Sequence, residues 1–354
     1  MKPRLIWILV IVVSLALWSA AVVLLYASVP VLQGDPAGSD PVRIDVPAGS
    51  SLQTVADALH RAGVVNHPTI FKRYGILAHF DRQIRSGEYE FVSGESYKRI
   101  LERLRQGDIL QIRVTILEGL TNREVAERLQ QTLGFEPDSF LTLTVSADLI
   151  REYNVDSPSL EGYLYPDTYY FPSKNSPREV IEAFLQRFFT VWTSEHEERA
   201  RALGMTRGQV LTLASIIEGE VLVHAESRRV SAVYHNRLQQ NMLLQADPTV
   251  LYALGGEKRR VLYSDLRVES PYNTYVNLGL PPGPICNPSL MAIEAALNPL
   301  EETGELYFVA ANDGSGRHVF SRTYQEHLNA KAKAQRLLRR RRQPMTSSRT
   351  PANR

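Results

Sequence analysis

The sequence predicts an α+β protein with an apolar N-terminal helix, a small α/β unit and a larger mixed α+β unit built around a buried helix. Three observations support this prediction. Residues 5 to 27 carry no charge. Strand and helix patterns then alternate, without a regular repeat along the whole chain. The run "LASIIEGEV", residues 213 to 221, places Glu218 in an apolar helical pattern. The expected parts are residues 1–28, 29–41, 42–112, 113–330 and 331–354.

Composition excludes some classes of protein. The chain has 354 residues, of which 44% are hydrophobic and 22% charged, as in ordinary globular proteins. Residues 41 to 330 hold 29 basic against 36 acidic side chains, so this part is not a nucleic-acid-binding surface. Cys286 is the single cysteine, which excludes a disulfide scaffold.

The N-terminal segment is long enough to anchor the chain in a membrane. Twenty-three helical residues span about 34 Å, whereas a hydrocarbon core is about 30 Å thick. A signal peptide has a shorter apolar stretch, so we expect an uncleaved anchor. Lys2 and Arg4 precede the segment and predict a cytoplasmic N-terminus, with the rest of the chain outside the cytoplasmic membrane. Residues 30 to 41, rich in Pro, Gly, Ser and Asp, indicate a linker.

A short pattern occurs twice, 70 residues apart. "IDVPAGSSLQTVADAL" (44–59) matches "VTILEGLTNREVAERL" (114–129), and each copy predicts a strand, a Gly turn and a helix that begins after Ser or Thr. Thr121 and Glu124 fit a capping box. The unit from Val42 to about Asp108 resembles a LysM-like domain, a small fold that often binds N-acetylglucosamine-containing glycan, although the resemblance alone does not imply such binding here. The alternative is a spacer domain.

The segment "EGYLYPDTYYF", residues 161 to 171, is rich in aromatic side chains. Aromatic rings stack on the C–H faces of sugars, but such runs more often form core strands. The carboxylates of Glu161 and Asp167 within the run favour a cleft. Further along, we expect one helix over 177–203, a helix over 224–241, a hairpin over 305–321 with turns at Asp313–Gly314 and Ser315–Gly316, and a basic C-terminal helix.

Glu218 is the candidate general acid. Its helix begins with a capping-box pattern, Thr206 and Gln209, and is apolar nearly all round, which predicts burial. A desolvated glutamate favours its protonated form, as the acid of a glycosidase must. The alternative is a helix-end Glu bonded to backbone or paired with Arg228 or Arg229. Glu220 lies about 200° round the helix and is not expected to act on the same bond.

Several blocks along residues 115 to 330 resemble the YceG-like family of endolytic murein transglycosylases. They include "EGLTNREVAERL", "LEGYLYPDTYYF", "LASIIEGE", "RVSAVYHNRL", "LQADPTVLYALG", "SPYNTYVNLGLPPGPICNPS" and "YFVAANDGSGRHVFS". The resemblance implies that Glu218 is the family's catalytic glutamate. Ala246 departs from the Ser or Thr common in the family's "LQ(S/T)DPT" motif but leaves Gln245 and Asp247 in place. The candidate substrate-binding residues are Glu161, Tyr165, Asp167, Tyr169, Gln245, Asp247, Ser270, Tyr272, Asn273, Thr274, Tyr275 and His318.

One carboxylate suffices for the implied chemistry. A lytic transglycosylase uses the 6-hydroxyl of the substrate's own muramic acid as nucleophile, so a single glutamate can give and later take a proton. A lysozyme-type hydrolase with Asp247 as second carboxylate remains an alternative, as does a non-catalytic glycan-binding scaffold. The His residues lack a metal-ligand spacing such as HExxH, and we expect no metal or cofactor. The resemblance implies penicillin-binding protein synthases as partners, and we expect no nucleic acid partner.

Overall fold

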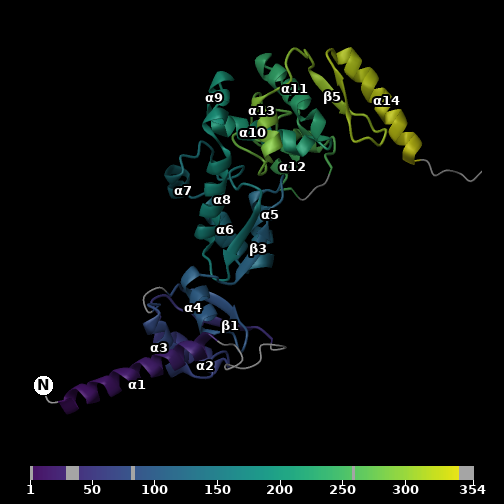
Figure 1. Cartoon of the computed structure of the whole chain (residues 1–354). Helices are drawn as coiled ribbons and strands as arrows, with labels where there is room; N and C mark the ends of the chain where they lie inside the picture. The colour runs from purple at the N-terminus through teal and green to yellow at the C-terminus, as the bar shows by residue number, and fades with distance from the viewer. Residues whose placement is uncertain (1–2, 29–39, 81–83, 257–259, 343–354) are drawn as a thin grey trace, which may run out of the picture. The chain divides into compact units, whose positions relative to one another are not determined.

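The computed structural model describes residues 3–28, 40–80, 84–256 and 260–342 (Figure 1). The chain divides into two compact units. Unit 1 comprises residues 1–114 and 170–175, and unit 2 comprises residues 115–169 and 176–354. The predicted linker at 29–41 lies almost wholly outside the described residues. The division between the units falls two residues from the expected boundary at 112/113.

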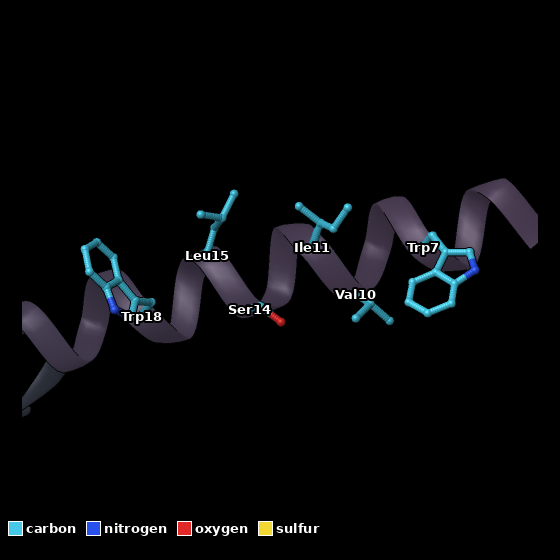
Figure 2. A pocket seen from close by; sticks show the side chains of 6 residues that line it. All are labelled: Trp7, Val10, Ile11, Ser14, Leu15 and Trp18. Carbon is cyan, nitrogen blue, oxygen red and sulfur yellow. The ribbon is translucent and has the colours of Figure 1, made fainter.

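Helix α1, Pro3–Ser28, is long and apolar enough to cross a membrane, and residues 6–24 are not buried by the rest of the chain. Figure 2 shows six of its side chains, with Trp7 and Trp18 toward opposite ends of the stretch and Ser14 between them. This agrees with the predicted helix. By its length and composition, α1 is a candidate membrane span.

From residue 42 to residue 106, unit 1 follows the order strand, helix, helix, strand, helix. Its elements are β1 (Val42–Val46), α2 (Leu52–Arg61), α3 (Pro68–Leu77), β2 (Gly87–Phe91) and α4 (Tyr97–Gln106). Strands β1 and β2 pair antiparallel, with Val42 opposite Phe91 and Val46 opposite Gly87. The helices bury apolar and aromatic side chains, among them Phe71, Tyr89 and Tyr97. The likeness of this unit to LysM domains stays a prediction.

The twice-occurring pattern forms the predicted local structure in both places. Ser51 caps α2 by accepting from the backbone N–H of Thr54, and Thr121 caps α5 (Asn122–Leu133) by accepting from Glu124 N–H in a complete capping box. Gly49 and Gly119, which precede these caps, have φ of 75° and 77°, a conformation that L side chains rarely adopt. Strand β3 (Gln111–Thr115), which leads into the second copy, pairs with β4 (Thr168–Pro172).

Unit 2 is mainly helical. Its elements after α5 are α6 (Pro137–Thr144), α7 (Ala147–Glu152), α8 (Pro177–Val191), α9 (Ser194–Ala202), α10 (Arg207–Glu220), η2 (His224–Glu226), α11 (Ser227–Gln239), α12 (Asp247–Ala253), η3 (Asp265–Arg267), α13 (Leu290–Leu297), β5 (Tyr307–Ala310), β6 (His318–Ser321) and α14 (Tyr324–Arg342). Helix α10 packs against α9, α11, α12 and α13. The α+β class is therefore confirmed.

The expected single helix over 177–203 is wrong at Trp192. The backbone there is extended, and Thr193 begins α9 by accepting from the backbone N–H of His196. Trp192 turns back to stack on Phe188, with ring centroids 6.0 Å apart. The cap at Thr193 and the packing of Trp192 on Phe188 therefore divide into two helices a segment whose periodicity alone predicted one.

The C-terminal elements confirm the predicted hairpin. Strands β5 and β6 pair antiparallel from Tyr307 opposite Ser321 to Ala310 opposite His318. In the turn, Asp313 Oδ1 accepts from the backbone N–H and the hydroxyl of Ser315. Helix α14 packs on both strands, as Figure 1 shows in yellow beside β5, and the contact clustering places it within unit 2. Residues 343–354 of the predicted basic tail lie outside the described residues.

Candidate active site around Glu218

Glu218 lies in the last turn of α10, where the buried part of the helix ends. The predicted capping box at Thr206 and Gln209 is present, and every residue from Val210 to Ile217 is buried. Glu218 itself is only half-buried. The helix therefore brings the carboxylate to the edge of the core rather than into it. A half-buried position is one that a substrate can reach.

Ser289 holds one oxygen of this carboxylate. The backbone N–H and the hydroxyl of Ser289 both donate to Glu218 Oε2, at 2.9 and 2.5 Å. Ser289 is the N-cap of α13. The two arginines considered as partners of Glu218 form other hydrogen bonds. Arg228 donates to the carbonyl of Asn298, and Arg229 donates to the carboxylate of Glu305. The structure therefore shows the backbone contact of the alternative interpretation, from the N–H of Ser289, but no pairing of Glu218 with either arginine.

Two loops meet beside Glu218. The N–H of Gly119 donates to the carbonyl of Asn287, and the N–H of Asn287 donates back to the carbonyl of Leu120, both at 2.9 Å. A Cβ on Gly119 would lie 3.6 Å from Cγ of Glu218. The loop after β3 and the loop before α13 therefore both border the candidate acid. Sequence reasoning missed Asn287 and Ser289 as site residues, although both lie within the quoted "ICNPS" block.

Glu161 is buried beneath this junction and does not face solvent. Its carboxylate accepts from the backbone N–H of Asn122 at 2.8 Å and from the hydroxyl of Tyr252 at 3.4 Å. Burial raises the pKa of Glu161 to about 8, and these two hydrogen bonds offset only part of that effect. With 5% of its surface exposed, Glu161 supports the loops, and its contact with substrate stays a prediction.

Glu220 occupies a different environment from Glu218. Its carboxylate accepts from the hydroxyl of Tyr234 at 3.1 Å. Burial, together with the negative charge of Asp247, raises the pKa of Glu220 to about 7, against the hydrogen bond from Tyr234. Glu218 and Glu220 thus have separate partners, as their positions on the helix led us to expect. Burial thus raises the pKa of two glutamates, Glu161 and Glu220, that sequence reasoning did not choose as the general acid.

The "LQADPT" segment is joined to the "SPYNTY" segment through Thr274. The N–H of Gln245 donates to the carbonyl of Thr274 at 3.1 Å, and the N–H of Ala246 donates to its hydroxyl at 3.0 Å. Gln245 has a φ of 51°, which is uncommon for a residue other than glycine. Asn273 and Thr274 are buried, with 0% and 1% exposure, and therefore brace this loop from inside.

The start of α12 approaches the end of α10 closely. A Cβ on Gly219 would lie 2.8 Å from Cβ of Pro248, so a larger residue would push the two helices apart. Asp247 is exposed at the first position of α12 and accepts from the hydroxyl of Tyr275 at 2.6 Å. The structure therefore brings Gln245, Asp247 and Tyr275 together next to the helix of Glu218.

The remaining predicted residues are held by internal contacts. Asp167 accepts from Arg187 at 2.7 Å, and the hydroxyl of Tyr169 donates to the carbonyl of Tyr165 at 2.6 Å. The ring of Tyr272 packs on Tyr252 at 4.8 Å. These contacts order the aromatic segment, and contact with a glycan stays a prediction for all of them.

Two further predicted residues complete the set. The hydroxyl of Ser270 accepts from the N–H of Tyr272 at 3.2 Å. His318 lies on β6, where its Nδ1 atom is 2.9 Å from an oxygen of Glu226. Because the His318 side chain is only 8% exposed, most of the ring is used within the protein. Among the residues described, no three His, Cys, Asp or Glu side chains are grouped so that they could hold a metal ion.

Together, the fold and this site define an α+β chain with a helix-borne carboxylate at the edge of the core, bordered by loops that are hydrogen-bonded to one another. The family model of the YceG-like family matches residues 44–333. The chain therefore belongs to the YceG-like family, as its sequence blocks predicted.

Individual relatives agree with this assignment. The chain is similar to the endolytic murein transglycosylase of Bacillus subtilis (strain 168), with 33% identity over 309 residues that cover 82% of this chain and 84% of the relative. It is 28% identical over 327 residues to the protein of that name from Streptococcus pneumoniae (serotype 2 strain D39), covering 82% of this chain and 59% of the relative. The crystal structure of a putative yceG-like protein from Listeria monocytogenes matches with a TM-score of 0.58 and 32% identity, covering 82% and 99% of the two chains.

Proposed function

We propose that this protein is a membrane-anchored endolytic murein transglycosylase with Glu218 as its single acid and base. The observation that carries the proposal is the setting of Glu218, half-buried at the end of α10 with one oxygen held by Ser289 and the other free of described partners. The names of the relatives from B. subtilis and S. pneumoniae support the same activity. The substrate would be the β-1,4 bond from N-acetylmuramic acid to N-acetylglucosamine.

The proposed reaction needs no external nucleophile. Glu218 donates a proton to the glycosidic oxygen as the bond from C1 to that oxygen breaks. The 6-hydroxyl of the muramic acid then forms a new bond to C1, and the Glu218 carboxylate accepts the hydroxyl proton. The product carries a 1,6-anhydro ring, and Glu218 regains its starting protonation state. Because the nucleophile belongs to the substrate, it is present at high effective concentration.

The biological setting is part of the proposal. Helix α1 would hold the enzyme in the cytoplasmic membrane with its N-terminus inside, so that unit 2 meets nascent glycan strands outside. Internal cleavage there would end the elongation of strands made by penicillin-binding protein synthases. The LysM-like unit would contact the same glycan. Among the candidate residues, the exposed Gln245 and Asp247 and the half-buried Tyr165 and Tyr275 would line the glycan-binding surface.

A hydrolase is the second candidate, because the structure offers two further carboxyls near α10. Glu220 has a pKa of about 7, suitable for acid–base work, and Asp247 is exposed beside it. A lysozyme-type reaction with one of these as second carboxylate would add water to the cleaved bond. Such a mechanism makes a different product, so the two candidates are separable by mass.

The test is digestion of purified glycan strands by the full chain in detergent, with products identified by mass spectrometry. Anhydro ends, lighter by one water than hydrated ends, are expected from the natural enzyme and from Glu220→Gln. Glu218→Gln should abolish cleavage. Hydrated ends that depend on Asp247 would favour the hydrolase. Binding to the strands without cleavage by any variant would favour a glycan-binding scaffold and contradict the proposal.

A further inference from the structure

The two oxygens of the Glu218 carboxylate have unequal surroundings. Oε2 accepts two hydrogen bonds, from the backbone N–H and the hydroxyl of Ser289. Among the residues that the structure describes, none forms a hydrogen bond or an ion pair with Oε1. The proposed reaction by itself does not require two hydrogen bonds from one serine to a single oxygen of Glu218.

The direction of the Ser289 hydroxyl is set by the helix that it caps. Its oxygen accepts from the backbone N–H of Ala292 at 3.2 Å, in the first turn of α13. A hydroxyl that accepts from one side is free to give its own hydrogen to the other. Its hydrogen is therefore available to Oε2, which lies 2.5 Å from the oxygen. Helix capping and carboxylate binding use the same side chain.

We propose that Ser289 is a positioning residue that makes Oε1 the proton-carrying oxygen of Glu218. This inference rests on the proposed function. A proton on Oε2 would meet two donors that already point at that atom, so the neutral acid must carry its proton on Oε1. The free oxygen, with its proton, then faces the substrate. Ser289 itself touches neither the glycan nor the reacting atoms.

The same contact becomes stronger during the reaction. When Glu218 gives up its proton it becomes a carboxylate, and hydrogen bonds to an ionised acceptor are stronger than those to a neutral one. The N-terminus of α13 also carries partial positive charge, which favours a negative group beside it. An interaction that grows as the proton leaves lowers the barrier, whereas an equal interaction in both states would not.

The charged and titratable groups near Glu218 do not stabilise the negative charge of its carboxylate, whereas Ser289 does. Cys286, in the loop before α13, stays neutral because burial and the nearby Glu161 and Glu218 carboxylates raise its thiol pKa. Asp247 and Glu220 are the acidic groups at the junction of α10 and α12. Among the described residues, no cation pairs with Glu218. The hydrogen-bond donors to its carboxylate are the backbone N–H and the hydroxyl of Ser289.

Three substitutions separate positioning from helix capping. Ser289→Ala removes the hydroxyl and the cap, Ser289→Gly removes the hydroxyl but costs little as a cap, and Ser289→Thr keeps both. We expect the kcat of the Ala and Gly variants to fall by about tenfold or more with little change in KM. The alkaline limb of their pH–kcat/KM profile should move to higher pH, because the ionised form loses a donor. Ser289→Thr should restore both properties.

Equal rates and pH profiles for Ser289→Gly and the natural enzyme would overturn the proposal. If Ser289→Ala alone loses stability, and the Gly and Thr variants keep the natural rate, then Ser289 serves only as a helix cap and the proposal is wrong. A second measurement does not need activity. We would follow the ¹³C signal of the Glu218 carboxyl with pH in the full chain and expect its titration midpoint to rise in Ser289→Gly but not in Ser289→Thr.

This second measurement also separates the two proposals. If the midpoint moves but neither the natural enzyme nor its variants cleave glycan, the contact is real and the proposed function fails. If glycan is cleaved in a Glu218-dependent way and the midpoint stays fixed in Ser289→Gly, the proposed function stands and the role of Ser289 is wrong.

Discussion

The interiors of the two units differ in what they bury. The core of unit 1 consists of apolar and aromatic side chains, such as Phe71 and Leu104. In unit 2 the buried residues include amides, hydroxyls and charged groups, among them Glu161, Asn287 and Arg237. Among the described residues of unit 1, no Asn, Asp, Glu, Ser, Thr or Arg is buried as a whole residue to this extent. The Glu95 side chain is the nearest case, 8% exposed and paired with Arg99 and Arg103.

This difference indicates which unit carries the chemistry. A buried polar group is costly unless it is hydrogen-bonded, and an apolar group of the same size would avoid that cost. In unit 2 the buried polar groups join loops that border Glu218, for instance through Asn287 and Thr274. Unit 1 needs only a stable core, whereas unit 2 must hold irregular backbone in one arrangement. The following predictions test that distinction.

The largest effect on stability is expected from Phe71→Ala in unit 1. Phe71 is fully buried and packs edge-on against Tyr97 at 5.3 Å. Its truncation should lower the free energy of unfolding of unit 1 by about 3–5 kcal/mol. Chemical denaturation of the full chain, followed by a probe in each unit, measures this loss. Cleavage by unit 2 should persist wherever unit 1 remains folded, and a fall in kcat there would contradict the separation of roles.

A smaller loss of stability, with a larger loss of activity, is expected from Asn287→Ala in unit 2. The Asn287 Oδ1 atom accepts from the N–H groups of Gly162 and Leu164 at 2.9 and 3.0 Å. The alanine leaves these two buried donors unpaired, and with relaxation of the loop we expect a total loss of about 1–3 kcal/mol. Because the same loop leads to Ser289, kcat should fall even at temperatures where the variant is folded. Unchanged kcat in folded protein would show that the loop is held without Asn287.

Glu161 should make the stability of unit 2 depend on pH. Its folded pKa of about 8 exceeds the ordinary value of 4.5, so between these values the folded state holds a proton that the unfolded state has lost. Stability therefore falls as pH rises through this window, by up to about 1.4 kcal/mol between pH 6 and 7. Glu161→Gln should make this slope smaller in denaturant titrations at several pH values, and the slope that remains below pH 7 is the part due to Glu220, whose pKa is raised to about 7. An equal slope in both proteins would contradict the assignment to Glu161.

Much of the local structure could be predicted from the sequence because it depends on neighbours in the chain. The capping boxes at Thr121 and Thr206, the hairpin turn at Asp313 and the apolar helix of Glu218 all have short-range signals. The break at Trp192 was missed because no Gly or Pro marks it and because the cap that begins α9 pairs Thr193 with His196 rather than with the usual Glu or Gln.

The site was predicted less completely, because its contacts join distant parts of the chain. Ser289 and Glu218 are 71 residues apart, and Asn287 and Gly162 are 125 apart. No spacing rule links them. The half-buried position of Glu218 likewise depends on where α10 ends against its neighbours. Family resemblance pointed to Glu218 itself, but only the folded chain shows which of its oxygens is held.

The smallest effect is expected where charges are solvated. Arg151 donates to Asp148 at 2.6 Å, but both side chains are nearly four-fifths exposed, so water screens the pair. Arg151→Ala should change the free energy of unfolding by no more than about 0.5 kcal/mol.

Arg229→Ala is the matched control within unit 2, because it leaves the carboxylate of Glu305, only 10% exposed, without its partner. Denaturation of both variants should show a clearly larger loss for Arg229→Ala, since a shielded charge without a partner costs more than a solvated one. Equal losses would mean that burial of polar groups does not set the stability of unit 2, and the contrast between the two interiors would lose its energetic basis.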